Sequence, residues 1–330
     1  MSKQKICLVV AALALGLIAV LGLVVVGTVA PPVGGDSVWF LKRHAMSLVA
    51  GLALAVLAAQ VPWRFWLKAA MPLFVLWGFV FVAGAACDPV DGRCRYLPMG
   101  PLRIDSWTLA WPAAGLLLAW VRTKISFGSR WLLLVGLSVG TLAMMCATVV
   151  KVLDDPNLKA RVLESVGIAE PATNVVSEVH CRVLEQELLH EAYQSSKWIG
   201  RNDDVAGVTV PHGHTSGVSS ATALRFGRVF PIGVLVLFGI VLGALGLIGR
   251  WTRDAAGRLL VFFYGLWLCV PAAYNLAACD KIVPCFGLGV PLVSFGMTAV
   301  LVACIGYGVV WSIVREDDSA PSAERRTQGA

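Results

Sequence analysis

Residues 6–30 read ICLVVAALALGLIAVLGLVVVGTVA, an apolar run without a charged side chain. A helix of about 20 such residues crosses the hydrocarbon core of a bilayer. No convincing small-x-small cleavage site follows this run, so we expect a retained first span rather than a signal peptide. The whole chain of 330 residues is 58% hydrophobic and only 14% charged, against about 25% charged in soluble domains. The composition therefore predicts an all-α, polytopic helical membrane protein.

Apolar windows of suitable length predict about eight transmembrane helices. They lie near residues 6–30, 45–62, 66–86, 106–121, 131–153, 229–249, 258–278 and 287–314. Residues 1–153 would then carry about five N-terminal spans, residues 154–228 one long polar loop, and residues 229–314 about three C-terminal spans. The polar tail 315–330 is expected to be disordered.

Basic residues predict the orientation, because Lys and Arg are enriched in cytoplasmic segments. Most of them flank the connections that share a side with the N-terminus: Lys3, Lys5, Arg64, Lys68, Arg122, Lys124, Arg130, Arg250, Arg253, Arg258, Arg315, Arg325 and Arg326. Both termini are therefore expected in the cytoplasm, and the loop 154–228 outside. This bias and contact with membrane lipids account for the net charge of +7, which is no indication of nucleic-acid binding.

Within the long loop, residues 157–167 and 175–196 favour helices. Val179, Val183, Leu184 and Leu188 recur at helical spacing in the second stretch, which is typical of an amphipathic helix. Such a helix could lie on the membrane or pack over the spans. Long loops in compact proteins often carry function; a poorly ordered insert is the alternative.

Four cysteines bracket two short loops, Cys87 with Cys94 and Cys279 with Cys285. If these loops face an oxidising compartment, each pair can form a disulfide; free thiols are the equal alternative. The spacing of the cysteines does not match a metal site.

Glycines and a proline suggest two local features of the C-terminal spans. Gly239, Gly243 and Gly246 are expected to permit close helix packing. A second set could break the last span into a re-entrant piece, since irregular backbone at membrane depth must line protein or water; ordinary entry from a loop into a helix is the alternative. This set is Gly287, Gly289, Pro291 and Gly296.

Several short stretches, in order along most of the chain, resemble motifs of the SEDS family, the FtsW/RodA/SpoVE-type proteins of cell division and cell shape. They are residues 36–44 (DSVWFLKRH), 91–100 (DGRCRYLPMG), 193–194 (YQ), 211–215 (PHGHT), Asn275 and 284–296 (PCFGLGVPLVSFG). The resemblance implies a bacterial inner (cytoplasmic) membrane protein of peptidoglycan synthesis. It implies glycan polymerisation from lipid II on the outer face, beside a class B penicillin-binding protein that acts as transpeptidase.

The implied chemistry needs a base for the acceptor hydroxyl and positive charge for the leaving diphosphate. Arg, Lys or a divalent cation could supply that charge, so a divalent cation is possible although no cofactor is certain. The resemblance and the chemistry suggest substrate contacts at Lys42, Arg43, Arg95, His214, Thr215, Ser216 and Ser294. Arg103 and Arg225 are further candidates for the diphosphate. Interfacial side chains that snorkel are the alternative reading of the cations.

The chain also departs from the family pattern. It has about eight spans where the family has ten, and Ser216 stands where the family has the acidic residue after His-Thr. A hydroxyl is not basic at neutral pH and would need its own activating partner. Asp203 and Asp204 could supply a displaced catalytic carboxylate, and Asp91 and Asp105 are further candidates. No metal site is expected, because the pair of histidines in His212-x-His214 lacks a placed third ligand.

Three functions remain open at this point. A peptidoglycan glycosyltransferase is the leading hypothesis. A catalytically inactive SEDS-like scaffold or regulator would keep the fold without the base. A lipid-precursor transporter would need charged side chains inside the spans, and the sequence has almost none.

Overall fold

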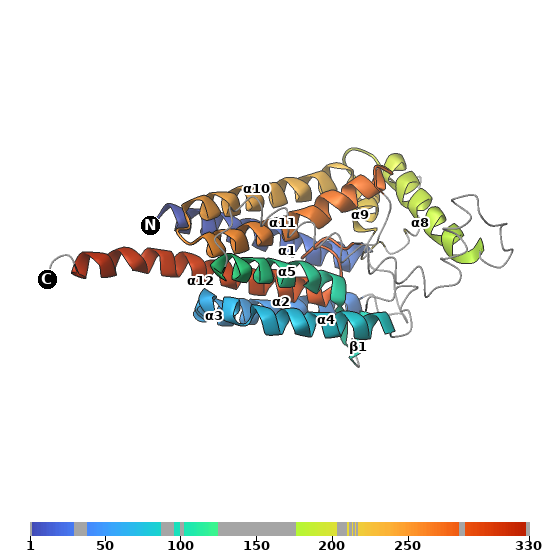
Figure 1. Cartoon of the computed structure of the whole chain (residues 1–330). Coiled ribbons are helices and arrows are strands. Elements are labelled where there is room, and N and C mark those ends of the chain that lie inside the picture. Colours follow the sequence, from blue (N-terminus) through green and yellow to red (C-terminus); the bar gives the residue numbers. More distant parts are fainter. Residues whose placement is uncertain are drawn as a thin grey trace.

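The computed structural model describes residues 2–29, 38–86, 96–99, 102–124, 176–202, 210, 213, 215, 217–283 and 288–327. These residues form a bundle of long helices that lie side by side (Figure 1). The helices are α1 (Lys3–Val29), α2 (Val38–Gln60), α3 (Trp63–Lys68), α4 (Ala70–Ala86), α5 (Ser106–Lys124), α8 (Val176–Ser195), α9 (Val218–Phe226), α10 (Val229–Trp251), α11 (Ala255–Cys279) and α12 (Met297–Thr327).

The structure confirms the fold class, a polytopic helical membrane protein. In the described ranges, α1, α2, α10, α11 and residues 297–319 of α12 are long and apolar enough to cross a membrane. Helix α4 includes a shorter apolar stretch, Ala70–Ala83. The predicted span 66–86 is divided at Ala69, where α3 ends and α4 follows. The predicted span 131–153 and the predicted helix 157–167 lie outside the described residues.

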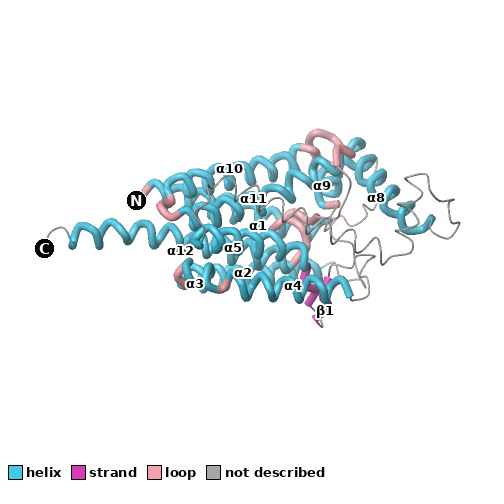
Figure 2. Tube along the Cα trace, in the orientation of Figure 1, coloured by secondary structure: helices cyan, strands magenta, loops and turns pink. Residues whose placement is uncertain are grey.

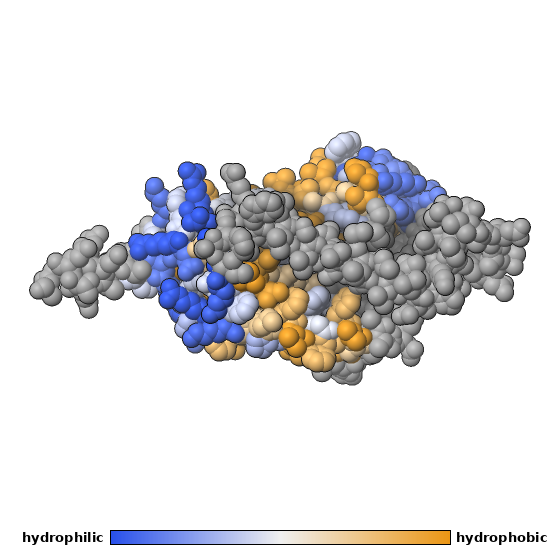
Figure 3. Space-filling model, viewed as in Figure 1, coloured by the Kyte–Doolittle hydropathy of each residue, from blue (hydrophilic) through white to orange (hydrophobic). Residues whose placement is uncertain are grey.

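The helices pack around one apolar core. Helix α1 lies against α10, α2 against α12, and α11 between α10 and α5. Ile18, Phe238, Leu245, Leu268 and Ile313 are fully buried where these helices meet. Apolar side chains on the outside of the bundle face lipid, which costs nothing in a bilayer because lipid tails are as apolar as leucine. Figure 3 shows this apolar middle with hydrophilic residues towards the ends.

The N- and C-terminal ends of the chain lie at the same end of the bundle (Figure 1). Lys5 Nζ lies 3.0 Å from Asp318 Oδ2. Ser2 Oγ donates to the same oxygen at 3.2 Å, and Gln4 Nε2 donates to Asp317 Oδ2 at 3.3 Å. These contacts join the first turn of α1 to α12.

The prediction that residues 315–330 are disordered is therefore wrong for the first residues of this tail. Helix α12 does not end near residue 314 but continues to Thr327. Asp317 and Asp318, within the predicted tail, hold the start of α1. The sequence pattern of polar and small residues did not reveal this, because the stabilising partners are more than 300 residues away in the chain.

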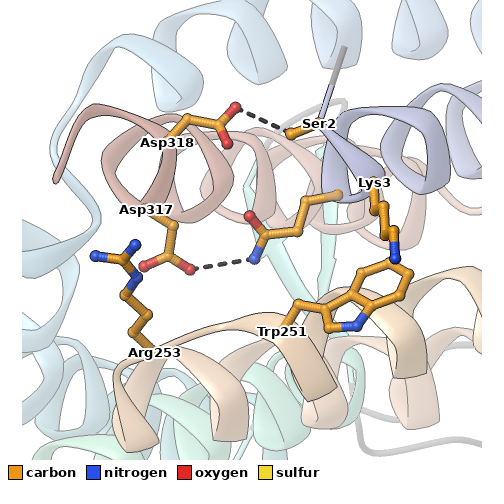
Figure 4. A pocket seen from close by; sticks show the side chains of 7 residues that line it. Ser2, Lys3, Trp251, Arg253, Asp317 and Asp318 are labelled. Atoms are coloured by element: carbon orange, nitrogen blue, oxygen red, sulfur yellow. Dashed lines mark hydrogen bonds between the residues drawn. The ribbon is translucent and has the colours of Figure 1, made fainter. Parts of the chain in front are cut away.

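A cavity of about 220 Å³ lies at this end, between α1, α12 and the connection from α10 to α11. Figure 4 shows the side chains around it, with both acidic and basic groups facing the space. The lining residues are Ser2, Lys3, Gln4, Trp251, Arg253, Asp317 and Asp318. Helices α8 and α9 lie at the other end of the bundle (Figure 1).

The glycines of α10 do not have the predicted role among the described residues. A Cβ atom added at Gly239, Gly243 or Gly246 would meet nothing within 4 Å in that part of the chain. Close approaches occur instead at Gly22 in α1 and Gly308 in α12, where an added Cβ would lie 2.0 Å from Leu292 O and 2.3 Å from Ala55 O. The predicted packing role of the α10 glycines therefore stays a prediction, and the close approaches within the described residues lie on other helices.

A short antiparallel hairpin precedes α5, and the sequence analysis did not predict it. Strands β1 (Tyr96–Met99) and β2 (Leu102–Asp105) pair with Tyr96 opposite Asp105 and Met99 opposite Leu102. The hairpin lies at the end of the bundle opposite the termini (Figure 2). Pro98 weakens any strand signal in the sequence, since proline cannot donate to a ladder.

Candidate functional site

The sequence motifs meet at the end of the bundle away from the termini. Helix α9 packs against α8, α1, α10 and α11 there. The segment 288–296, which joins α11 to α12 beyond a gap at 284–287, lies beside the same elements through the contacts given below. Helix α8 confirms the predicted helix 175–196 almost to the residue, and it packs on α9 and α11 rather than standing alone.

Asn275 connects two parts of this end. It lies near the end of α11 and is only 3% exposed. Its Oδ1 accepts a hydrogen bond from Ser219 N at 3.2 Å, and its Nδ2 donates to Leu288 O at 2.9 Å. Gly217, at the N-cap of α9, has no side chain to cap the helix. Asn275 therefore satisfies one of the backbone N–H groups that every helix start leaves unpaired, and it holds segment 288–296 at the same time.

Segment 288–296 is irregular and buried. The predicted last span 287–314 begins as a helix only at Met297. Val290, Leu292 and Val293 are each less than 5% exposed although they are not helical. Among the two alternatives from the sequence, this favours a segment that enters the protein interior over ordinary entry into a helix, because buried irregular backbone must be paired within the protein.

Leu292 is the most constrained residue of this segment. Its φ is +65°, in the left-handed region that a branched side chain rarely adopts. Its carbonyl oxygen accepts a hydrogen bond from His44 Nε2 at 3.3 Å. Gly22 in α1 lets the same carbonyl approach closely, since any Cβ there would overlap it. Strained backbone of this kind persists only where its surroundings hold it, and here α1 and α2 do so.

His44 is buried in α2 with 1% exposure. Because a carbonyl can only accept, Nε2 carries the proton in the bond to Leu292 O. Nδ1 has no hydrogen-bond partner among the described residues. In the sequence, His44 is only the last letter of the motif 36–44. A polar residue at the entry of a span was the signal that it needs a partner inside the protein.

Ser294 lies in the same segment and does not present its hydroxyl to solvent. Its Oγ donates to Val290 O at 2.8 Å, and its side chain is 3% exposed. A Cβ at Gly289 would lie 2.5 Å from this Oγ and 3.9 Å from Thr215 O. Ser294 thus closes a turn next to the motif 211–215, and its predicted contact with substrate stays a prediction.

The motif 211–217 is described at Gly213, Thr215 and Gly217. Gly213 N donates to Val210 O at 3.1 Å, and an added Cβ there would meet Ala221 of α9 and Val29 of α1. Gly213 is thus packed between α1 and α9. His214 and Ser216 lie outside the described residues, as do Arg95, Asp91, Asp203 and Asp204.

Lys42 and Arg43 lie on successive faces of the first turns of α2. Lys42 is exposed. The Arg43 guanidinium lies 5.1 Å from the centroid of the Trp39 ring, at a distance typical of a cation–π contact. Trp39 and Phe40 in turn pack on Phe295 at 6.0 and 4.9 Å between centroids. Arg43 is therefore attached through aromatic rings to the end of segment 288–296.

Arg225, another candidate for the diphosphate, has a structural partner. Its Nη2 donates to Thr28 O at 3.0 Å. That oxygen belongs to the last turn of α1, where helices leave carbonyl groups unpaired and favour a cation. Arg103 has no described side chain.

Asp105 is the one described residue among the four candidate bases. Its Oδ2 accepts from Thr108 Oγ1 at 2.9 Å, a bond between side chains in the first turn of α5. Its N–H donates to Thr298 Oγ1 at 3.2 Å. Thr298 is the second residue of α12, two positions after segment 288–296, so Asp105 lies at the border of the candidate site.

Asp280 is a further carboxylate that the sequence analysis missed. It follows α11 directly and accepts a hydrogen bond from Gln194 Nε2 at 3.0 Å. Burial, and then the charge of Asp280, raise the pKa of the Tyr193 phenol above its usual value of 10.0. Tyr193 is therefore neutral at physiological pH. Gln194 and Tyr193 form the motif 193–194, which thus joins α8 to the end of α11.

The structure describes only one of the four cysteines in the two predicted disulfides. Cys279 Sγ lies 3.2 Å from Asn275 O and 3.1 Å from Ser220 Oγ. Cys87, Cys94 and Cys285 lie outside the described residues, so both pairings stay predictions. Within the described ranges, no group of three His, Cys, Asp or Glu side chains could hold a metal ion.

Comparison with known proteins identifies the fold. A family model described as "Cell cycle protein", that of FtsW, RodA and SpoVE, matches residues 207–319. The structure superposes on a chain from a study of structural coordination of polymerisation and crosslinking by a peptidoglycan synthase complex, with TM-score 0.66 and 21% identity over 93% of this chain and 97% of the other. It also superposes on the Rod shape determining protein RodA of Thermus thermophilus, with TM-score 0.63, 21% identity and coverage of 93% and 96%.

Curated relatives extend the match over the chain. The probable peptidoglycan glycosyltransferase FtsW of Thioalkalivibrio sulfidiphilus is 25% identical and covers 96% of this chain and 92% of its own length. The FtsW of Xanthomonas oryzae pv. oryzae is 25% identical, with coverage of 92% and 72%. The first alignment spans 377 positions, more than the 330 residues of this chain, so the relative has segments that are missing here. In sequence over nearly its whole length, and in fold, the chain is similar to the SEDS family, the FtsW/RodA/SpoVE-type proteins.

Proposed function

We propose that this protein polymerises peptidoglycan glycan strands from lipid II in cell division or cell-shape maintenance. The observation that carries the proposal is the alignment of nearly the whole chain with relatives named probable peptidoglycan glycosyltransferases. The fold is consistent with it, because the described residues of three matched motifs (Tyr193, Gly213 and segment 288–296) lie around α9 and Asn275 at one end of the bundle.

Different residues at this end of the bundle would have different roles in the reaction. Lys42 and Arg43 supply positive charge at the entry of α2, where the diphosphate of a lipid-linked sugar would leave. Segment 288–296 lies beside them, since Phe295 packs on Trp39 and Phe40. The acceptor hydroxyl needs a carboxylate base, for which Asp203 and Asp204 remain the first candidates and Asp105 the second. Arg95, His214, Thr215, Ser216 and Ser294 would line the substrate, and a divalent cation could assist the diphosphate.

A scaffold without catalysis is the second candidate. It is favoured by one observation, Ser216 in place of the acidic residue that the family pattern carries after His-Thr. In either case the partner would be a class B penicillin-binding protein. The similarity in fold to a chain of a peptidoglycan synthase complex is consistent with such a partner.

The test is polymerisation of labelled lipid II by the purified full chain, with and without its transpeptidase, in the presence of moenomycin to silence unrelated polymerases. We expect glycan product, and a rate about 100-fold lower when the base is replaced by Asn. Variants at Asp203, Asp204, Asp105 and Asp91 are compared with Asp318→Asn, a matched control at the opposite end of the bundle. A stable complex with the transpeptidase but no product would refute the polymerase and leave the scaffold.

The proposal also requires the candidate site to face outward in the inner membrane, with both termini in the cytoplasm. Ile282, 74% exposed after α11, marks the site end, and Arg253 marks the end with the termini. In spheroplasts we expect Ile282→Cys to react with a membrane-impermeant maleimide and Arg253→Cys to react only after lysis. Each signal is read above that of the parent protein, which has nine cysteines. The reverse pattern would contradict this orientation.

A further inference from the structure

The loop of residues 197–200, here called the Trp198 loop, is fixed to the junction of α9 and α10. Arg228 N donates to Lys197 O at 2.9 Å, Val229 N to Trp198 O at 3.1 Å, and Gly200 N to Phe226 O at 3.1 Å. The loop follows α8 and lies along the outer side of the bundle near the start of α10 (Figure 2). Its backbone is therefore held in place although it carries no regular secondary structure.

Gly227 makes this attachment possible. Its φ is +94°, and an added Cβ would lie 2.5 Å from Trp198 O and 2.7 Å from Ile199 Cα. Arg228 holds the loop from the other side. Its guanidinium lies 5.8 Å from the centroid of the Trp198 ring and 5.4 Å from that of Tyr193, and its Nε donates to Ser196 O at 3.2 Å.

The fixed loop nevertheless presents large apolar side chains. Trp198 is 65% exposed and Ile199 77% exposed. A rigid loop in water gains nothing from exposing such groups, since removal of apolar surface from water is favourable. Their exposure therefore points to a partner or a lipid phase.

The exposed face of α10 next to the loop favours lipid over a protein partner. Val229, Val236, Ile240 and Leu247 are all exposed and follow one another at intervals of seven, four and seven residues, so they share one face of the helix. On a membrane-spanning helix this face meets lipid. Val229 begins the stripe and donates to Trp198 O, so the Trp198 loop continues the lipid-facing stripe at its end.

Length and charge agree with this position. The 23 residues of α10 extend about 34 Å at 1.5 Å per residue, close to the thickness of about 30 Å of the hydrocarbon core. Trp251 ends the helix and is 37% exposed, so a tryptophan lies at each end of the stripe, as in the aromatic belts of membrane proteins. Lys197 in the loop and Arg201 directly after it are exposed and positively charged, which suits anionic headgroups.

We propose that the Trp198 loop is a lipid anchor, which inserts Trp198 and Ile199 into the headgroup region of the bilayer and contacts anionic phospholipid. The anchor would keep α8, which carries the motif 193–194, and α9, which follows the motif 211–215, at the membrane surface. The proposal does not depend on glycan polymerisation, because it rests on the position and chemistry of the loop alone. A docking site for another protein is the competing occupant and is separated by the test.

The test places a photo-cross-linking amino acid at Ile199 of the full chain in native membranes. Position Val236, on the lipid-facing stripe, is the matched lipid control, and Glu191, exposed on α8, is the matched aqueous control. After illumination, mass spectrometry measures phospholipid adducts. We expect the yield at 199 to resemble that at 236 and to exceed that at 191 by about fivefold or more, as for a side chain buried in the headgroup boundary.

Two results would overturn the proposal. Adducts at 199 with a protein and not with phospholipid would assign the loop to a docking surface. A phospholipid yield at 199 no higher than at 191 would place the loop in water. The same measurement at position 198 gives a second reading of the loop, and it must agree with the first for the anchor to stand.

Discussion

Gly22→Ala is expected to lower the free energy of unfolding by about 3 kcal/mol and to abolish most activity of the site. The new methyl group would lie 2.0 Å from Leu292 O and 3.0 Å from its carbonyl carbon. Backbone cannot move aside as the end of a flexible side chain can. Helix α1 or segment 288–296 must therefore shift, and the hydrogen bond from His44 to Leu292 O is lost with it.

Gly16→Ala is the matched control for this substitution. Gly16 lies in the same helix and is exposed, and an added Cβ there meets nothing within 4 Å among the described residues. Alanine is also the better helix former, so stability should change by less than about 1 kcal/mol. Unfolding of both variants in detergent is followed by titration with denaturant. Equal stability of the two variants would show that α1 and segment 288–296 do not pack as described.

Asn275→Leu is expected to cost about 3 kcal/mol of stability and to remove activity, because it takes the side-chain partner from one buried and one part-buried backbone group. These groups are Ser219 N–H at the start of α9 and the carbonyl of Leu288. Leucine resembles asparagine in size and is apolar, so lost packing does not explain the effect. Thermal unfolding and lipid II polymerisation measure the two consequences on the same preparation.

Asn275→Asp separates the two hydrogen bonds. A carboxylate keeps the acceptor for Ser219 N–H and suits a helix start, but it cannot donate to Leu288 O. We expect about half the stability loss of the leucine variant together with an equally low activity, because segment 288–296 is released. Asn202→Ala removes an exposed amide that donates to Ser195 O and should cost less than about 1 kcal/mol. An active Asn275→Asp variant would refute the role given to the bond with Leu288.

The spans could be predicted from hydropathy because it is a local property. The windows 6–30, 229–249 and 258–278 correspond to α1, α10 and α11 within a few residues. Helix α8 was likewise visible in the spacing of its apolar residues. The start of the last span was placed ten residues too early, since segment 288–296 is as apolar as a helix and its irregular backbone is set by contacts with α1, α2 and α11.

The site was only partly predictable for the same reason. Gly22, His44 and Asn275 act through partners more than ten residues away, and two of these partners are main-chain oxygens that no sequence pattern marks. A lone glycine in an apolar run resembles the glycines of α10, which meet nothing among the described residues. Asn275 carried a usable signal, since a buried polar residue inside a span is costly and needs partners.

An assay for glycan strands made from lipid II tests most sharply whether this protein is a polymerase. The purified full chain is reconstituted in vesicles with its transpeptidase, and product length is resolved on gels in the presence of moenomycin. We expect long glycan strands from the parent protein and from Gly16→Ala. The polymerisation rate of Gly22→Ala and of Asn275→Leu should be at least about tenfold lower. A folded parent protein that binds its transpeptidase and makes no strands would contradict the proposed polymerase function.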